Sequence, residues 1–153
     1  ALKSGDSILD EWRKSNMIEL VENKLDVDTY FQLRKSVNWK TLSPEQGKKA
    51  LENSLFTVCA YEDGKPVGMG RIVGDGVVID YIQDLVVTPQ CQGKGVGRMV
   101  IERLISYVKE SKIPDTEIML CLMCAKGREE FYKRFNFVAR PTQELGPGMI
   151  QRL

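Results

Sequence analysis

The stretch 85-LVVTPQCQGKGVGRMVIERLI-105 decides the fold, because an apolar strand, a glycine-rich turn and an amphipathic helix follow one another directly. The apolar run ends at Thr88-Pro89, and apolar residues return at helical spacing after Gly97. A helix begins with unpaired N–H groups and a partial positive charge, and proteins usually place a capping side chain or an acid there. No Asp or Glu occurs between Leu85 and Ile101. A bound anion such as a phosphate is therefore predicted to cap this helix.

Two alternatives stay open for the glycines at positions 93, 95 and 97. They either let the backbone approach an anion, with Lys94 and Arg98 adding charge, or they serve tight strand–helix packing alone. Two well-known phosphate loops fit poorly. The sequence has no GK[ST] for a Walker loop, and a spacing of two differs from the GxGxxG of dinucleotide-binding folds.

The remaining pattern predicts an α/β chain with a mixed, largely antiparallel sheet and helices on both faces. Three strand-like runs joined by short glycine turns form an antiparallel meander, and the helix that begins at Gly97 leads to a parallel strand. Asp26 and Ser43 are the predicted caps of two earlier helices, the second with Pro44 and Gln46 in a capping box. Strands are predicted over 17–22, 55–62, 66–73, 77–87, 117–123, 137–140 and 149–153, and helices over 7–15, 44–53, 97–109 and 128–135. A further helix is predicted to begin after Asp26, with apolar residues from Val27 to Leu33 at helical spacing.

Length and charge set limits on the function. The 153 residues predict a single domain over 1–153, with 1–16 as an N-terminal extension or helix. A net charge of +1 argues against a nucleic-acid partner, and no apolar run reaches the length of a membrane span. The polar N-terminus does not resemble a secretory signal, so we expect a cytoplasmic protein.

The chain contains no histidine, which excludes Ser-His-Asp and Cys-His catalysis and HExxH metal sites. Of its four cysteines, Cys121 and Cys124 form a CxxC within a strand-like run. Residues i and i+3 of a strand point to opposite faces, so these thiols are poorly placed to share a ligand. We therefore predict no metal site and free, hydrophobe-like thiols.

The run from Leu85 to Gly97 resembles the acetyl-CoA-binding segment of the GNAT superfamily of N-acetyltransferases, with its [RQ]-x-x-G-x-[GA] signature matched by Gln92, Gly95 and Gly97. The run 131-FYKRFNF-137 is similar to a second segment of that family. The resemblance implies the GNAT-like acyl-CoA N-acyltransferase fold, with strands 77–87 and 117–123 splayed around the thioester. It also implies that the pyrophosphate of coenzyme A binds main-chain N–H groups of Gln92, Gly93, Lys94, Gly95, Val96, Gly97 and Arg98, and that the pantetheine arm runs beside Leu85, Val86 and Val87.

Two positions depart from the family pattern. Asn136 stands where a glycine is usual, and asparagine is the next-best residue for a left-handed backbone after a helix. Many members also have an asparagine at the end of the strand before this helix, whereas this chain reads Cys124-Ala125-Lys126-Gly127.

The catalytic expectations follow from the absence of histidine. Tyr132 matches the family tyrosine that protonates the departing thiolate, and its pKa near ~10 keeps it protonated at neutral pH; the alternative is that it only packs with neighbouring aromatic rings. Asp84 is the first candidate for the base that takes the amine proton, with Asp80, Tyr81 and Glu144 as competitors. Asp84 can instead hydrogen-bond a loop, and family members often use water chains.

The sequence thus predicts an acetyl-CoA-dependent N-acetyltransferase that acts on a small primary amine by direct transfer in a ternary complex. Cys91 lies in the phosphate loop, which argues against an acetyl-cysteine intermediate. The alternatives are a protein lysine or N-terminal acetyltransferase, a non-catalytic acyl-CoA-binding module, and a nucleotide-binding domain. The oligomeric state is open, with a homodimer as the form that is common in the family.

Overall fold

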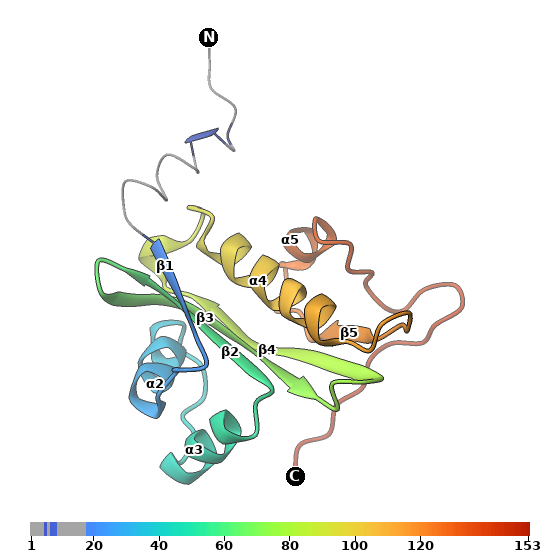
Figure 1. Ribbon diagram of the computed structural model, residues 1–153, viewed down its shortest axis with the longest axis horizontal. Coiled ribbons are helices and arrows are strands. Elements are labelled where there is room, and N and C mark those ends of the chain that lie inside the picture. Colours follow the sequence, from blue (N-terminus) through green and yellow to red (C-terminus); the bar gives the residue numbers. More distant parts are fainter. Residues whose placement is uncertain (1–4, 6, 9–17) are drawn as a thin grey trace.

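The computed structural model describes residues 5, 7, 8 and 18–153, so most of the helix expected over 7–15 lies outside the described residues. The chain alternates between strands and helices as predicted (Figure 1). The elements are β1 (Ile18–Glu22), α2 (Val27–Ser36), α3 (Pro44–Glu52), β2 (Phe56–Glu62), β3 (Lys65–Gly74), β4 (Ile79–Val87), the 3-10 turn η1 (Pro89–Cys91), α4 (Val96–Ser111), β5 (Met119–Leu122) and α5 (Glu129–Lys133).

Local signals set the starts of the two helices that precede the meander. The Asp26 carboxylate accepts a hydrogen bond from the Thr29 N–H at 2.8 Å and caps α2. At α3, the Ser43 hydroxyl and the Gln46 side chain accept from each other's main-chain N–H groups, and Pro44 opens the first turn. Both predicted caps are confirmed, because they depend only on residues within one turn.

The sheet has the order β1-β2-β3-β4-β5 among the described residues. Every pair is antiparallel except β4 and β5, which are parallel neighbours from Ile79↔Met119 to Ile82↔Leu122. The turn between β2 and β3 has positive φ at Asp63 (48°) and Gly64 (78°), as a tight hairpin requires. The predicted mixed, largely antiparallel sheet is therefore confirmed.

Helices cover both faces of this sheet (Figure 1). Helix α4 packs on one face, where Val100, Ile101 and Leu104 are fully buried against β2, β3 and β4. On the other face, α2 places Tyr30 and Leu33 against the sheet, and both side chains have no exposed surface. The cofactor-binding candidates lie where β4 runs into α4.

A β-bulge interrupts β4 in its middle. Met69 pairs with Val86 and Arg71 pairs with Gln83, so Gly70 alone faces two residues of β4. The first of those two residues, Asp84, has a left-handed backbone with φ of 58°. The extra residue reverses the alternation of the strand, because Ile82 and Leu85 both pack on the α4 side although they are three residues apart.

The two last predicted strands are wrong. Residues 137–153 are all described and contain no strand. Met149 and Ile150 are 88% and 70% exposed, so the apolar pattern of 149–153 has no surface to pack against. A main-chain turn, in which the Thr142 N–H donates to the Leu145 carbonyl, separates the two runs. A strand exists only with a paired edge, which alternation in the sequence does not supply.

Candidate active site

The glycine-rich loop joins the end of β4 to the start of α4. Gly93 and Gly95 have φ of 76° and 85°, so both positions use the left-handed conformation that glycine adopts without strain. Gly95 is the N-cap of α4, and no side chain of the described residues caps this helix. No acid occurs in its first turn either. A helix start without a capping side chain or an acid is suited to bind an anion.

Gly97 lies at the contact between α4, β4 and α5. A Cβ atom there would lie 3.4 Å from Cγ2 of Val87 and 3.5 Å from Cζ of Phe131. The first turn of α4 thus lies in contact distance of both the end of β4 and the aromatic side of α5. Both distances are ordinary van der Waals contacts, so packing alone does not require a glycine at position 97, whereas the positive φ of Gly93 and Gly95 favours glycine in the loop.

The second half of β4 has one open side. Pairing with β5 stops at Ile82↔Leu122, and on that side the residues from Gln83 to Val87 have no strand partner among the described residues. On the other side, the Thr88 N–H donates to the Val67 carbonyl of β3 at 2.9 Å. Because hydrogen-bonding direction alternates along a strand, the main-chain groups of Val87 and Leu85 point to the open side. The family resemblance implied Leu85, Val86 and Val87 for the pantetheine arm; the main chain of Val86 instead faces its partner Met69 in β3.

Two contacts border the opening between β4 and β5. The Met123 N–H, just after β5, donates to the Tyr81 hydroxyl at 3.0 Å. Gln92 in the loop donates its side-chain amide to the Val87 carbonyl at 3.0 Å. The open stretch of β4 is therefore bounded by Tyr81 at one end and by the glycine loop at the other.

Tyr132 lies on α5 near this opening. Its ring packs edge-on against Phe131, with centroids 5.1 Å apart, and against Phe137, at 6.0 Å. Burial raises the pKa of the Tyr132 hydroxyl to about 12, and the nearby Cys124 thiol acts in the same direction. The hydroxyl is thus held in its protonated form, which is the form that a proton donor needs. Both expectations for Tyr132, packing and a protonated hydroxyl, are compatible with this geometry.

Asp84 lies on the α2 side of the sheet, and its side-chain oxygens are already engaged. Oδ2 accepts from the Tyr30 hydroxyl at 2.5 Å and from Nε of Arg71 at 2.8 Å. Oδ1 accepts from Nη1 of Arg34 at 2.7 Å. The residue is 4% exposed. These contacts favour the structural alternative for Asp84 over the role of a base that takes a proton from the amine.

Two of the three competing base candidates, Asp80 and Tyr81, are neighbours in β4, and the third, Glu144, lies near the C-terminus. Asp80 is buried at the opposite end of β4, where Oδ1 accepts from the Gly76 N–H at 3.0 Å. Tyr81 borders the opening, and burial raises the pKa of its hydroxyl. Glu144 is exposed in the turn that follows Thr142. Of these three residues, only Tyr81 lies beside the open half of β4.

Some residues near the candidate site were not expected from the sequence. Nη2 of Arg128, at the start of α5, lies 3.4 Å from Oε1 of Gln92 and brings a third cation to the loop. In the sequence, Arg128 is marked only by its position four residues before Tyr132. Tyr30, Arg34 and Arg71 lie far from Asp84 in sequence, so no local pattern links them. At the departure from the family pattern, Asn136 does adopt a left-handed backbone, with φ of 66°.

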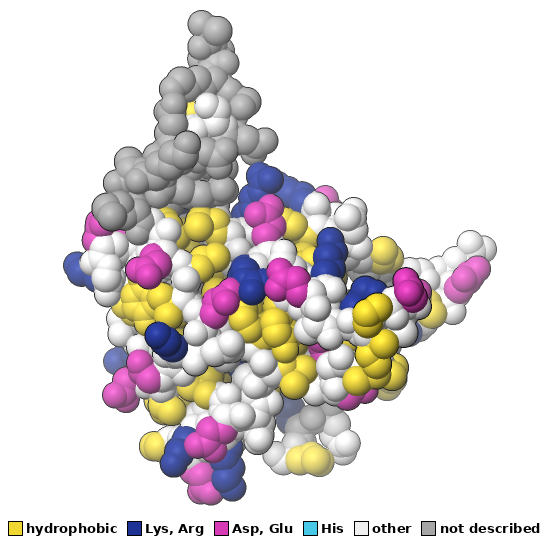
Figure 2. All heavy atoms as spheres, in the orientation of Figure 1, with side chains coloured by type: hydrophobic (Ala, Val, Ile, Leu, Met, Phe, Trp, Pro, Cys, Tyr) yellow, Lys and Arg dark blue, Asp and Glu magenta, His cyan; other side chains and the backbone are white. Residues whose placement is uncertain are grey.

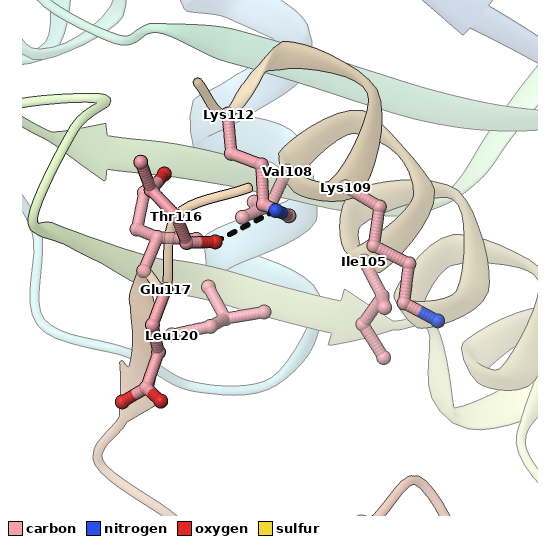
Figure 3. A pocket seen from close by; sticks show the side chains of 8 residues that line it. Ile105, Val108, Lys109, Lys112, Thr116, Glu117 and Leu120 are labelled. Atoms are coloured by element: carbon pink, nitrogen blue, oxygen red, sulfur yellow. Dashed lines mark hydrogen bonds between the residues drawn. The ribbon is translucent and has the colours of Figure 1, made fainter. Parts of the chain in front are cut away.

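A surface depression of about 460 Å³ lies elsewhere, between the C-terminal half of α4 and β5 (Figure 3). Lys112 lines it and donates to the Thr116 carbonyl at 2.7 Å. The start of β5 pairs with the start of β4, so this depression lies at the end of the sheet away from the glycine loop. It is distinct from the candidate cofactor site.

Three further features concern the cysteines, metal binding and membrane spans. Cys59, Cys91, Cys121 and Cys124, all in the described part of the chain, are free thiols, and burial raises the pKa of Cys59 to about 11. Within residues 18–153, no group of three metal-ligating side chains comes together. None of the helices that the structure describes combines the length and the apolar character of a bilayer span.

Comparison with known proteins identifies relatives of this chain. The family model described as "Acetyltransferase (GNAT) family" matches residues 20–137. The chain is 31% identical over 126 residues to serotonin N-acetyltransferase 2, chloroplastic, from Oryza sativa subsp. japonica, which covers 80% of this chain and 61% of the rice protein. The chain therefore spans about three fifths of the length of that curated relative.

Solved structures share the fold. A probable acetyltransferase of unknown function from methicillin-resistant Staphylococcus aureus superposes with a TM-score of 0.78 at 27% identity, covering 90% of this chain and 100% of that chain. A predicted acetyltransferase from Clostridium acetobutylicum, solved with acetyl-CoA, gives a TM-score of 0.63 at 18% identity, covering 84% of this chain and 93% of that chain. The second likeness is one of fold alone.

Proposed function

Because this chain belongs to the acetyltransferase (GNAT) family, we propose that it transfers the acetyl group of acetyl-CoA to a primary amine by direct transfer in a ternary complex. The observation that carries the proposal is the juxtaposition of the uncapped start of α4 with the open half of β4. The start of α4 offers N–H groups to an anion, and the open half of β4 offers strand hydrogen bonds to an extended arm. Coenzyme A has both parts in one molecule.

The residues divide between the two parts of the coenzyme. The N–H groups of the loop from Gln92 to Arg98 are proposed to bind the pyrophosphate, with Arg128 nearby. The main chain of Leu85–Val87 is proposed to bind the pantetheine arm, which then lies along β4 like a short added strand. The Clostridium protein of the same fold was solved with acetyl-CoA, which supports acetyl-CoA as the ligand to test first.

The chemistry requires one proton donor and one proton acceptor. The amine nitrogen attacks the acetyl carbonyl carbon, the carbon–sulfur bond breaks, and the electron pair stays on sulfur. Tyr132, with its pKa raised to about 12 by burial, is proposed to protonate that thiolate and to regain a proton from solvent. Since the Asp84 carboxylate already accepts from Tyr30, Arg34 and Arg71, we assign the removal of the amine proton to water.

A small amine is the proposed acceptor. The name of the rice relative, a serotonin N-acetyltransferase, supports a small acceptor, although this chain spans only 61% of that protein. On the face drawn in Figure 2, Lys and Arg side chains alternate with Asp and Glu, so the described residues visible there form no extended field of one charge. A lysine or N-terminus of a protein is the second candidate, and an acyl-CoA-binding module without turnover is the third.

Assembly and location belong to the same proposal. Strand β5 is the last strand of the sheet among the described residues, and its outer edge is available for pairing with a second copy. We therefore keep the homodimer as the proposed form. The expected cytoplasmic location stays a prediction, since the rice relative is named as chloroplastic.

The first test is a thermal melt with acetyl-CoA, ATP or a nicotinamide dinucleotide at equal concentration. Acetyl-CoA at ~100 times its Kd is expected to add about 2.7 kcal/mol of stability, which corresponds to about 5–10 °C for a domain of this size. A shift with another nucleotide and none with acetyl-CoA contradicts the proposal.

Turnover is then measured with a panel that contains serotonin, aliphatic primary amines and a lysine peptide. Preference for the small amines supports the first candidate, and preference for the peptide supports the second. Tight binding of acetyl-CoA without turnover of any acceptor supports the third.

A further inference from the structure

A cluster of four polar side chains lies on the α2 side of the sheet, directly behind the bulge of β4. The Asp84 carboxylate is at its centre and forms ion pairs with Arg34 at 2.7 Å and with Arg71 at 2.8 Å. The Tyr30 hydroxyl donates to the same carboxylate at 2.5 Å. The two arginine side chains are only 12% and 11% exposed, and that of Asp84 is 1% exposed. Together these four residues are called the Asp84 cluster below.

The backbone of Asp84 explains why the cluster is needed. Its φ of 58° is left-handed, and the first position of a bulge with such a backbone is normally a glycine. An aspartate there is less favourable for the chain than a glycine. The carboxylate offsets this cost, because it joins Asp84 to Tyr30, Arg34 and Arg71 through charge-assisted hydrogen bonds.

The cluster reaches from the bulge to both helices on this face. Arg34 of α2 also donates to the Lys40 carbonyl, in the connection between α2 and α3, at 3.0 Å. Arg71 also donates to the Ala50 carbonyl of α3 at 3.3 Å and to the Ser54 hydroxyl at 3.2 Å. The position of the bulge is thereby tied to α2, to α3 and to the segment that joins them.

The bulge also decides what β4 presents on its open side. The open half of β4 begins at Gln83, immediately before Asp84. Leu85 and Val87 follow the bulge, and the alternation of the strand after Asp84 depends on the extra residue there. A change in the backbone of Asp84 therefore changes the direction of the main-chain groups of Leu85 and Val87. The loop further along is linked to Val87 through the side chain of Gln92, whereas the left-handed backbones of its own glycines set its shape.

We propose that the Asp84 cluster positions the bulge of β4 and so aligns the main chain of Leu85 and Val87 with the pantetheine arm and the thioester. In this role Asp84, Arg34, Arg71 and Tyr30 are positioning residues that act through the backbone of β4. The inference rests on the proposed function, since it assumes that the open half of β4 binds the arm of acetyl-CoA.

The test compares two ligands that differ in the part the cluster acts on. Acetyl-CoA contacts both the loop and β4, whereas 3′-phosphoadenosine 5′-diphosphate has the phosphates without the pantetheine arm. Asp84→Asn and Asp84→Gly are expected to weaken acetyl-CoA at least about tenfold in calorimetric titration, and to leave the affinity for the diphosphate within about twofold. The turnover number is expected to fall as well.

Both substitutions remove the charge of the carboxylate, and only glycine also changes the backbone preference at this position. Glycine relaxes the left-handed conformation and removes the carboxylate, and asparagine keeps the size but removes the charge. Asp115→Asn is the matched control, because Asp115 is an exposed aspartate with φ of 60°. Both of its affinities are expected to equal those of the unmodified protein.

A milder variant covers the case in which the Asp84 variants do not fold. Tyr30→Phe removes one hydroxyl and keeps the buried ring, and it is expected to weaken acetyl-CoA about threefold without affecting the diphosphate. Equal losses for both ligands, or no loss of acetyl-CoA affinity, overturn the inference. Failure of the unmodified protein to bind acetyl-CoA would instead overturn the proposed function.

Discussion

At the scale of single residues, Tyr132 combines an aromatic environment with a polar tip. Phe131 and Phe137 pack edge-on against its ring, and burial raises the pKa of its hydroxyl to about 12. The ring can stay in place when the hydroxyl is removed, so packing and proton transfer can be separated by one substitution.

Tyr132→Phe is expected to lower kcat at least about tenfold and to leave the Kd of acetyl-CoA within about twofold, because it removes only the proposed proton donor. Steady-state kinetics and calorimetry measure the two quantities. Tyr107→Phe is the control, since Tyr107 stacks on Phe56 at 4.4 Å and its hydroxyl reaches only the Leu55 carbonyl. An unchanged kcat in Tyr132→Phe rules out the assigned role.

At the scale of elements, structure was predictable from the sequence where it depends on contacts between residues that are close together in the sequence. The caps of α2 and α3 were predictable because Asp26 and Ser43 contact residues three positions away. The glycine loop was predictable for the same reason. The strands expected at 137–140 and 149–153 failed because a strand depends on a distant partner, and alternation carries no information about that partner.

The capping box of α3 gives a prediction for a single element. Ser43→Ala removes the acceptor of the Gln46 N–H, which lies 3.1 Å away, and is expected to cost about 1 kcal/mol of unfolding free energy. That loss corresponds to a Tm lower by about 2–4 °C, measurable by calorimetry. The exposed Thr41, two residues earlier, provides the control substitution Thr41→Ala, whose Tm should stay unchanged. Identical melting of both variants would show that the box contributes nothing.

At the scale of the whole molecule, the candidate site combines predictable and unpredictable parts. Tyr132 and the loop lie in contiguous motifs. The contacts of Asp84 come from Tyr30, Arg34 and Arg71, which are separated from it by 54, 50 and 13 residues, and only the folded sheet brings them together. The sequence therefore revealed the likeness to a family, whereas the support behind β4 required the fold.

The pH dependence of folding is a second property of the whole molecule, and two aspartates affect it in opposite directions. Burial raises the pKa of Asp80, whose Oδ2 is the one buried side-chain oxygen without a partner in the described part of the chain. Its contribution to stability is present below the ordinary value near 3.8 and is lost as the pH rises through the raised pKa. Asp80→Asn is thus expected to gain stability relative to the unmodified protein as the pH rises above about 4.

Asp75 supplies the contrast. Hydrogen bonds from the main-chain N–H groups of Ile79, Val77 and Val78 lower its pKa, so its contribution is present above 3.8 and is lost as the pH falls. Asp75→Asn should therefore be less stable at neutral pH, and the difference should shrink in acid. Urea unfolding of each variant between about pH 3 and about pH 7 tests both slopes, and parallel curves for the two variants would contradict the assignment.

The high pKa of Tyr132 has a consequence for the unknown acceptor. The proposed donor titrates near 12, and the chain has no imidazole to titrate around neutrality. With neither group changing charge between about pH 6 and about pH 9, the ionisation of the incoming amine becomes the main source of curvature in the rate profile. The pH at the midpoint of the profile would then report the pKa of the acceptor amine. It should differ from one amine to the next in the order of their basicity.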